Sequence, residues 1–305
     1  MAFHILHTLK HGAELPPEVV NYMYSTGAFV ILKDFPEGHE FGIDYKSWTV
    51  GPKFLGLKMI PAGVHFVYCS VKGAPRIGFF HNFKSEEIVA KRWDAKKETF
   101  SDEVVSDEEI NRIRMNLKNI DSMLGPYPFE NYRSWYALTD FINGQTVERV
   151  NPLKGQISAQ AELVSMETCL MENEEADENR VGIDYTDRLE RVLRQLDGDW
   201  KQLLAEVQFA FACFLIGQVF EGFEQWKRVI HLLCCCPSAL GSRSDMFIAF
   251  IRVLFFELKE CPTDFFVDIV SRDNFLTTTL SMLFANIRGS ISCIGSLFAK
   301  IADFF

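Results

Sequence analysis

The chain has 305 residues, more than one ordinary hydrophobic core accommodates, so two domains are expected. Its net charge of −10 lacks the basic surface that phosphate-driven binding requires, so the chain alone is not expected to bind nucleic acid tightly. The longest apolar run, 207–220, falls short of the roughly 20 residues that span a bilayer, which argues against a membrane protein. Eight cysteines without paired spacing indicate reduced thiols in a cytoplasmic or nuclear compartment.

Segment 28–100 predicts an antiparallel β unit. Four short runs, rich in β-branched and aromatic residues, are separated by turns that contain glycine or proline. These runs are AFVILKDF (28–35), KFLGLKMI (53–60), GVHFVYCS (63–70) and RIGFFHNF (76–83). Between the first two lies EFGIDYKSWTVGPKF (40–54), which is dense in aromatic residues, glycine and lysine.

Two helices are predicted after these strands. The first begins at Ser106, which stands in capping-box register with Glu109, and ends at Gly125. The second runs roughly from Glu130 to Val147. Strands followed by helices indicate an α+β domain, predicted to cover residues 1–152.

Segment 153–183 predicts an acidic linker, with six acidic residues between Glu167 and Glu178 and no apolar period. Apolar residues at helical spacing then predict an all-helical domain over 184–305. Two stripes, 189–196 and 200–215, open this domain. Further helices are predicted over 218–235, 244–260, 264–271, 274–288 and 290–303.

His231 and the run Cys234 to Cys236 are candidates for metal or thiol chemistry. Successive helical positions diverge by about 100°, however, so these side chains cannot converge on one ion. The favoured interpretation is that the cysteines are small buried residues at a helix end. No metal site is therefore predicted.

Asp264 and Asp268 stand four apart on a predicted helix and could share acid–base work. Because Asp264 follows Thr263 and Pro262, its carboxylate equally suits a helix N-terminus. His65 is interpreted as a buried or rim histidine whose hydrogen bonds are satisfied. The sequence predicts no catalytic and no cofactor-binding residue, and the chain is interpreted as non-enzymatic.

Segment 40–54 combines aromatic and cationic side chains, types that are enriched at protein interfaces. Tyr45, Lys46 and Lys53 are the candidate partner-binding residues. Tyr45 and Lys53 are expected at the surface and Trp48 in the core. Composition alone favours the structural alternative, in which Phe41 and Trp48 fill the core and Tyr45 caps a turn.

Residues 40–68, EFGIDYKSWTVGPKFLGLKMIPAGVHFVY, closely resemble the signature of the A-one-cistron (AAR-two) family of splicing factors. Other matching stretches follow in the same order and extend the resemblance over about 28–288, apart from the acidic linker. They are GFF (78–80), LGPYPFENYRSWYALTDFI (124–142), EVQFAFACFLIGQVFEGFEQWKRVIHLLC (206–234) and PTDFFVDIVSRDNFLTTTL (262–280).

The resemblance implies a non-enzymatic assembly chaperone with a β-rich N-terminal domain and a VHS-like helical domain. It implies binding to the RNase H-like and Jab/MPN-like domains of the central spliceosomal scaffold protein. The chain would accompany the U-five small nuclear ribonucleoprotein and its proteins through cytoplasmic maturation. It would then give way to the particle's RNA helicase in the nucleus. No cofactor is implied.

Family members usually continue beyond the last helix with a tail that can add a strand between two partner domains. This sequence ends at Phe305, so the bridging strand is not carried over to it. Two other functions stay open from the residues alone. One is a helical adaptor that binds peptides in a groove, and the other is a hydrolase that uses the region of Asp264 and Asp268 or that of His231.

Overall fold

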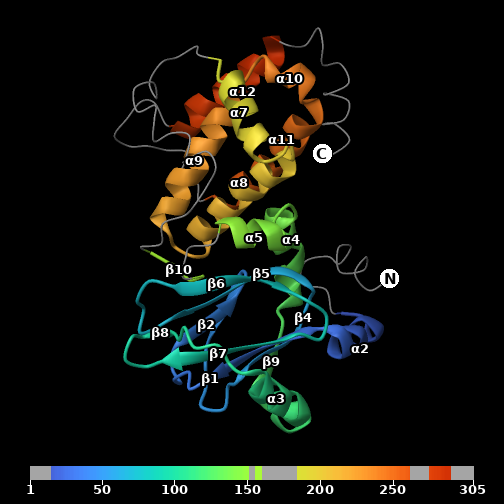
Figure 1. Ribbon diagram of the computed structural model, residues 1–305, viewed down its shortest axis with the longest axis vertical. Helices are drawn as coiled ribbons and strands as arrows, with labels where there is room; N and C mark the ends of the chain where they lie inside the picture. Colours follow the sequence, from blue (N-terminus) through green and yellow to red (C-terminus); the bar gives the residue numbers. More distant parts are fainter. Residues whose placement is uncertain (1–14, 151–154, 160–183, 262–274, 290–305) are drawn as a thin grey trace. The chain divides into compact units, whose positions relative to one another are not determined.

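A computed structural model describes residues 15–150, 155–159, 184–261 and 275–289 (Figure 1). Strands gather in the first half of the chain and helices in the second, so the predicted α+β class is confirmed. The chain divides into two compact units. The first comprises Met1–Tyr136, Asn143–Ala161 and Leu215–Val219, and the second comprises Ala137–Ile142, Glu162–Phe214 and Phe220–Phe305.

The segments of these two units alternate along the chain. The sequence instead predicts an uninterrupted first domain over 1–152, a linker over 153–183 and a second domain over 184–305. The three domain limits predicted from the sequence stay a prediction.

The strands of the first unit form two five-stranded sheets. Sheet A has the order β8-β7-β1-β4-β9 and sheet B has the order β10-β6-β5-β2-β3. The strands of sheet A are β1 (Ala28–Lys33), β4 (Gly56–Ile60), β7 (Ile88–Asp94), β8 (Thr99–Phe100) and β9 (Leu124–Pro126). Those of sheet B are β2 (Glu40–Ile43), β3 (Lys46–Thr49), β5 (Gly63–Ser70), β6 (Ile77–Phe83) and β10 (Ile157–Ser158).

Each of the four predicted strand runs contains a strand, but within segment 28–100 the predicted antiparallel pairing is wrong at one place, because β1 runs parallel to β7. Sheet A has a second parallel pair, β4 with β9, and β9 lies beyond the predicted segment. Parallel neighbours need a long connection that returns the chain to the same end of the sheet. Both connections contain β5 and β6, which belong to sheet B, so the second sheet itself supplies the crossover.

Side chains of β1 alternate between the two faces of sheet A. Leu32 joins the main core, which also takes in Phe41 of sheet B. Ile31 points the other way and packs under helix α3 (Asp107–Ile120), which lies against this side of the sheet (Figure 1). The side chains of α3 that pack against this side of the sheet are half-buried. They form its apolar stripe, Ile110, Ile113, Leu117 and Ile120.

Helix α3 begins as predicted, because the Ser106 side chain accepts a hydrogen bond from the Glu109 backbone N–H at 3.3 Å. Its end was predicted too late. The helix stops at Ile120, a 3₁₀ turn (Asp121–Met123) follows, and Leu124 opens β9 beside Gly56 of β4. The apolar Leu124 continues the helical stripe in sequence, but strand pairing decides its conformation.

The helix predicted over 130–147 is two helices, α4 (Tyr132–Thr139) and α5 (Gly144–Val150), after a 3₁₀ turn at Phe129–Asn131. The break has a local cause, because the side chain of Asn143 accepts a hydrogen bond from the Thr146 backbone N–H at 2.9 Å. An Asn side chain in this role starts a new helix. Helix α2 (Pro17–Thr26), which begins with a proline, was not predicted.

The described part of the second unit is helical. Its helices are α7 (Thr186–Gln195), α8 (Trp200–Leu215), α9 (Phe220–Cys234), α10 (Ala239–Ser242), α11 (Ser244–Glu260) and α12 (Phe275–Gly289). Helix α8 is buried on every side from Gln202 to Cys213, and α9 contacts both α7 and α12. The predicted helices over 264–271 and 290–303 lie outside the described residues.

Brief proteolysis of the native protein is expected to cut first between residues 151 and 182, because this acidic stretch lacks the apolar period that packing requires. Mass spectrometry of the early fragments measures the site. First cuts within 28–70 or 199–235 would contradict the predicted division.

Candidate partner-binding surface

The predicted partner-binding residues lie on or just after a β hairpin of sheet B. Strands β2 and β3 pair with Ile43 opposite Lys46, so the two residues between them, Asp44 and Tyr45, form the turn. Asp44 has φ +53°, a left-handed conformation that aspartate tolerates better than most residues. Tyr45 and Lys46 therefore stand at the hairpin tip.

The carboxylate of Asp44 points inward and is fully buried. Its Oδ2 lies 2.7 Å from His65 Nδ1 and accepts a hydrogen bond from the Tyr127 hydroxyl at 2.6 Å. Its Oδ1 accepts the backbone N–H of Phe66 at 3.0 Å. The turn is thus attached to β5 and to residue 127 from inside the unit, since a buried carboxylate is stable only with such donors.

Both ring nitrogens of His65 face acceptors within the protein. Nδ1 faces the Asp44 carboxylate, and Nε2 lies 3.0 Å from the Pro61 carbonyl oxygen. A nitrogen that faces a carbonyl must donate, so Nε2 donates to Pro61, and Nδ1 shares a hydrogen bond with the carboxyl group of Asp44. Burial first, and then the Asp44 charge, holds the pKa of Tyr127 well above its usual value, so Tyr127 stays a donor.

This network is structural. His65 is 1% exposed and neither ring nitrogen is available to a substrate, which confirms the interpretation of His65 as a satisfied buried histidine. The rings of Tyr127 and Trp135 flank the imidazole, at centroid distances of 5.2 and 6.4 Å. Nothing in the sequence pattern indicated the role of Tyr127, and for Asp44 the one local signal was its place directly after a short apolar strand.

On the outer side of the hairpin, the missing side chain of Gly42 leaves room for the ring of Tyr68. A Cβ at Gly42 would lie 2.4 Å from Cζ of Tyr68, whose ring crosses the strand at this position. The guanidinium of Arg76 lies 4.4 Å from the centroid of that ring, and it also pairs with Glu40 at 3.0 Å. Burial raises the pKa of Tyr68 to about 12, so the ring stays neutral.

The structure corrects two of the three exposure predictions in this segment. Lys46 and Lys53 are exposed, and Lys46 Nζ is 4.0 Å from a carboxylate oxygen of Glu130. Tyr45 is half-buried, not exposed as predicted. Trp48 is half-buried and packs against the main core from its edge, because β3 is the last strand of the sheet.

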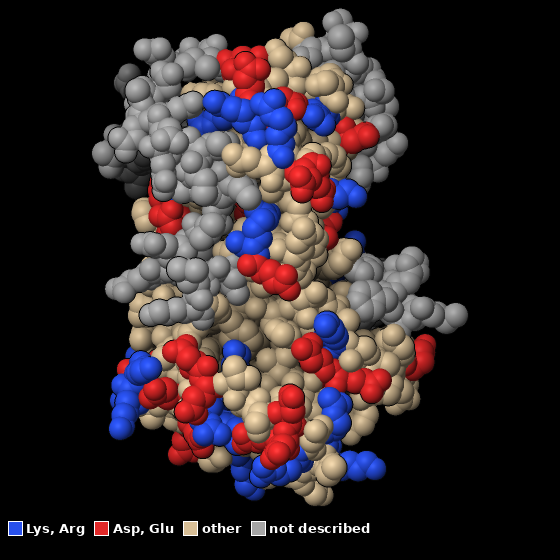
Figure 2. Space-filling view, viewed as in Figure 1, with Lys and Arg blue, Asp and Glu red and all other residues tan. Residues whose placement is uncertain are grey.

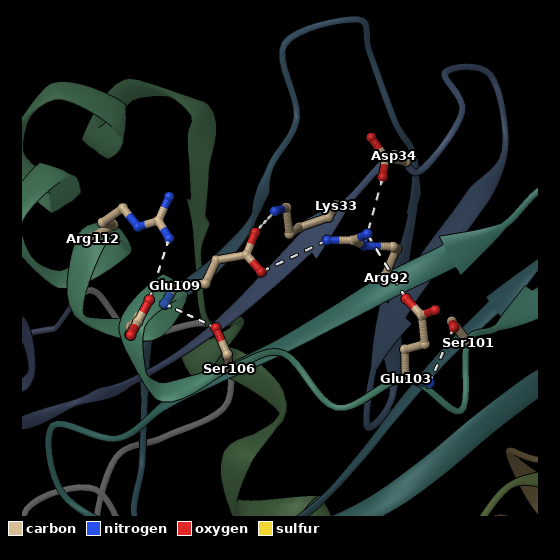
Figure 3. Close-up of polar contacts among 9 residues, drawn as sticks. Lys33, Asp34, Arg92, Ser101, Glu103, Ser106, Glu109 and Arg112 are labelled. Carbon is tan, nitrogen blue, oxygen red and sulfur yellow. Dashed lines mark hydrogen bonds and ion pairs between the residues drawn. The ribbon is translucent and has the colours of Figure 1, made fainter.

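A second polar cluster attaches α3 to sheet A (Figure 3). Glu109, in the first turn of α3, pairs with Lys33 of β1 and lies 3.6 Å from Arg92 of β7. Arg92 also approaches Asp34 and Glu103, at 4.0 and 3.9 Å. On the face shown in Figure 2, acidic and basic side chains are interspersed over the first unit, and no stripe of one sign crosses it. The cluster therefore attaches the first turn of α3 to β1 and β7.

The cysteine run at the end of α9 is buried, as the sequence predicted. Burial raises the pKa of Cys235 to about 11 and also raises those of Cys234 and Cys236, so these thiols keep their protons. Sγ of Cys235 lies 3.8 Å from Nε2 of His231. Among the described residues, no group of three or more His, Cys, Asp or Glu could hold a metal ion. Asp264 and Asp268 lie outside the described residues.

A buried acid in the second unit escaped the sequence analysis. Glu257 of α11 is fully buried, and its Oε2 accepts the indole N–H of Trp226 at 2.9 Å. Its Oε1 has no hydrogen-bond partner within the part of the chain that the structure describes. Burial raises the pKa of Glu257 to about 8, despite the stabilising bond from Trp226.

The geometry thus defines a class, a two-unit α+β protein that uses its buried polar groups to hold its own fold and exposes a fixed hairpin. Within the described ranges, no helix has both the length and the apolar character needed to span a membrane. Comparison with known proteins gives the family. A model described as the AAR2 N-terminal domain matches residues 26–152, and one described as the AAR2 C-terminal repeat region matches 168–304.

Curated relatives agree over nearly the whole length. Protein AAR2 homolog of Caenorhabditis elegans is 57% identical over 341 aligned positions, which cover 96% of each chain. The proteins of the same name from Mus musculus and Homo sapiens are 36% and 35% identical, over 90% of this chain and 86% of theirs. The chain belongs to the AAR2 family. Because 341 positions exceed its 305 residues, the nematode relative contains segments without a counterpart here.

Replacing Asp44 by asparagine is expected to lower the free energy of unfolding by about 1–3 kcal/mol, because the amide places a donor where the carboxyl oxygen accepts the buried Tyr127 hydroxyl. Asp34→Asn is the matched control. Asp34 also has a positive φ, of +61°, but its side chain is 70% exposed. Urea unfolding of both variants measures the difference, and equal losses would contradict the structural role of the buried pair.

Replacing Glu257 by glutamine is expected to change how stability depends on pH. The folded protein keeps this proton to about pH 8, whereas an unfolded chain loses it near pH 4.5. The folded state therefore binds the extra proton between these values, and the free energy of unfolding falls as pH rises, by up to about 1.4 kcal/mol per pH unit. Glu257→Gln removes this loss, so its stability relative to the unmodified protein should increase from pH 5 to pH 8. Glu260→Gln, exposed on the same helix, should show no such trend.

Proposed function

We propose that this chain is a pre-mRNA splicing factor that acts as an assembly chaperone of the U-five small nuclear ribonucleoprotein. It binds the RNase H-like and Jab/MPN-like domains of the central spliceosomal scaffold protein and blocks premature association of the RNA helicase. The observation that supports this proposal is membership of the AAR2 family over both halves of the chain, at 57% identity to the nematode relative.

Mutual exclusion is the proposed mechanism. The chaperone occupies scaffold surface that the helicase needs, so it must leave before the helicase can bind. Loading takes place in the cytoplasm and release in the nucleus. The chain acts by binding and not by catalysis, and RNA contacts are left to the scaffold.

The β2–β3 hairpin suits a docking role because it is held before a partner arrives. Its turn is held by the hydrogen bonds of the buried Asp44 carboxyl group. On its outer face, the Tyr68 ring occupies the space beside Gly42. A surface that is already ordered loses little conformational entropy on binding. The two exposed lysines, Lys46 and Lys53, would then meet acidic groups of the scaffold.

The test uses the purified full chain and a scaffold fragment that contains both partner domains. The two are expected to elute together in size-exclusion chromatography, and a helicase fragment added to this complex should not enter it. No complex with the scaffold fragment would overturn the proposal. A stable complex of all three proteins would overturn mutual exclusion.

Reversing both exposed lysines, Lys46→Glu with Lys53→Glu, is expected to weaken scaffold binding by roughly tenfold or more, because like charges would then face each other. The melting temperature should stay nearly unchanged, since both side chains are exposed. The control reverses Lys96 and Lys97, which are exposed in the turn between β7 and β8. Titration calorimetry measures both variants, and equal affinities would place the contacts elsewhere on the chain.

A further inference from the structure

Strand β3 forms a free edge of sheet B. It pairs with β2 on one side, and among the described residues no strand pairs with it on the other. With four residues, Lys46 to Thr49, it is longer than the opposite edge strand, β10, and than the two edge strands of sheet A, which have two or three residues each. It therefore offers more backbone for pairing than any other strand edge that the structure describes.

The pairing shows which backbone groups of β3 point outward. The backbone N–H of Asp44 donates to the Phe66 carbonyl of β5, so even-numbered residues of β2 bond toward β5 and odd-numbered residues toward β3. Val50 continues this pattern after the strand, because its N–H donates to the carbonyl of residue 39. Lys46 and Trp48 therefore use their backbone groups on β2, and those of Ser47 and Thr49 point away from the sheet.

The side chains along this edge fall into two rows. Lys46 and Trp48 stand opposite Ile43 and Phe41, on the side of the main core. Ser47 and Thr49 stand on the outer side. A strand added at this edge would place one row of its side chains beside an indole and an ammonium group, and the other row beside two small hydroxyl groups.

Charge decides which occupant this edge accepts. A lysine on an edge strand discourages pairing between two copies of the same chain, because the charge must be crowded or buried. The same lysine attracts a strand that carries a carboxylate in the facing row. Lys46 Nζ is 4.0 Å from Glu130, and both side chains are nearly half exposed, so this contact is weak and exchangeable.

We propose that the edge of β3 accepts an extended segment of the partner protein as an additional strand of sheet B. The segment carries an apolar side chain and an acidic side chain two residues apart, which face Trp48 and Lys46. Main-chain hydrogen bonds to Ser47 and Thr49 hold the segment, and the side chains of Trp48 and Lys46 determine which segment the edge accepts. This inference rests on the proposed function, because it takes the scaffold protein as the partner, and it specifies how that partner is held.

The experiment removes one outward N–H and leaves the inward ladder intact. Thr49→Pro deletes the outward donor, a change that edge strands tolerate, and Thr49→Ala keeps that donor while it removes the same hydroxyl. Binding of each variant to the scaffold fragment is measured by calorimetry. Thr49→Pro should weaken binding at least tenfold, and Thr49→Ala should stay within twofold of the unmodified protein.

A second measurement does not depend on the folding of the proline variant. Amide hydrogen exchange of the unmodified chain, followed by NMR, is compared with and without the scaffold fragment. The amides of Ser47 and Thr49 should exchange at least tenfold more slowly in the complex. Those of Lys96 and Lys97, in an exposed turn of sheet A, should not change.

The outcomes separate this inference from the function on which it rests. If the unmodified chain binds the fragment but the exchange of both amides is unchanged, the inference is wrong and the proposed function stands. A folded Thr49→Pro variant that binds as well as Thr49→Ala would also overturn the inference and leave the function standing. If the unmodified chain does not bind the fragment, both the function and the inference are overturned.

Discussion

A buried charge constrains the first unit more than any other single feature. The Asp44 carboxylate lies at zero exposure, and an ion removed from water is stable only where donors surround it. His65, Tyr127 and the backbone N–H of Phe66 supply these donors from β5 and from the segment after β9. Each of these elements must be in place before the carboxylate is satisfied, so the network favours a single arrangement of the hairpin tip.

The two-sheet architecture follows from how the chain returns to sheet A. Strands β5 and β6 form their own antiparallel pair within sheet B, and the chain then re-enters sheet A twice, at β7 and at β9. Both returns form parallel pairs, and such pairs need a long crossover connection. Helix α3 covers the face that β1 and β7 leave open, and Glu109 holds its first turn against both strands.

The polar chemistry of this protein is directed inward. Among the described residues, His65 is buried and bonded, and Cys235 and Glu257 keep their protons because burial disfavours the charged form. What the hairpin offers to a partner is backbone, two lysines and a half-buried indole. These are the groups that the proposed chaperone role would use, in a chain that belongs to the AAR2 family.

The sequence by itself determined the elements whose signals are local. The β-branched and aromatic run at 63–70 predicted β5, the Ser106 cap predicted the start of α3, and exposure was predicted for Lys53. Only the tertiary structure decided the parallel strand pairs, the end of α3 and the burial of Asp44. The reason is physical, since residues a few positions apart fix a cap or a short β-prone run between turns. The bond between Asp44 and Tyr127 joins residues 83 positions apart, and such a contact exists only after the sheets have assembled.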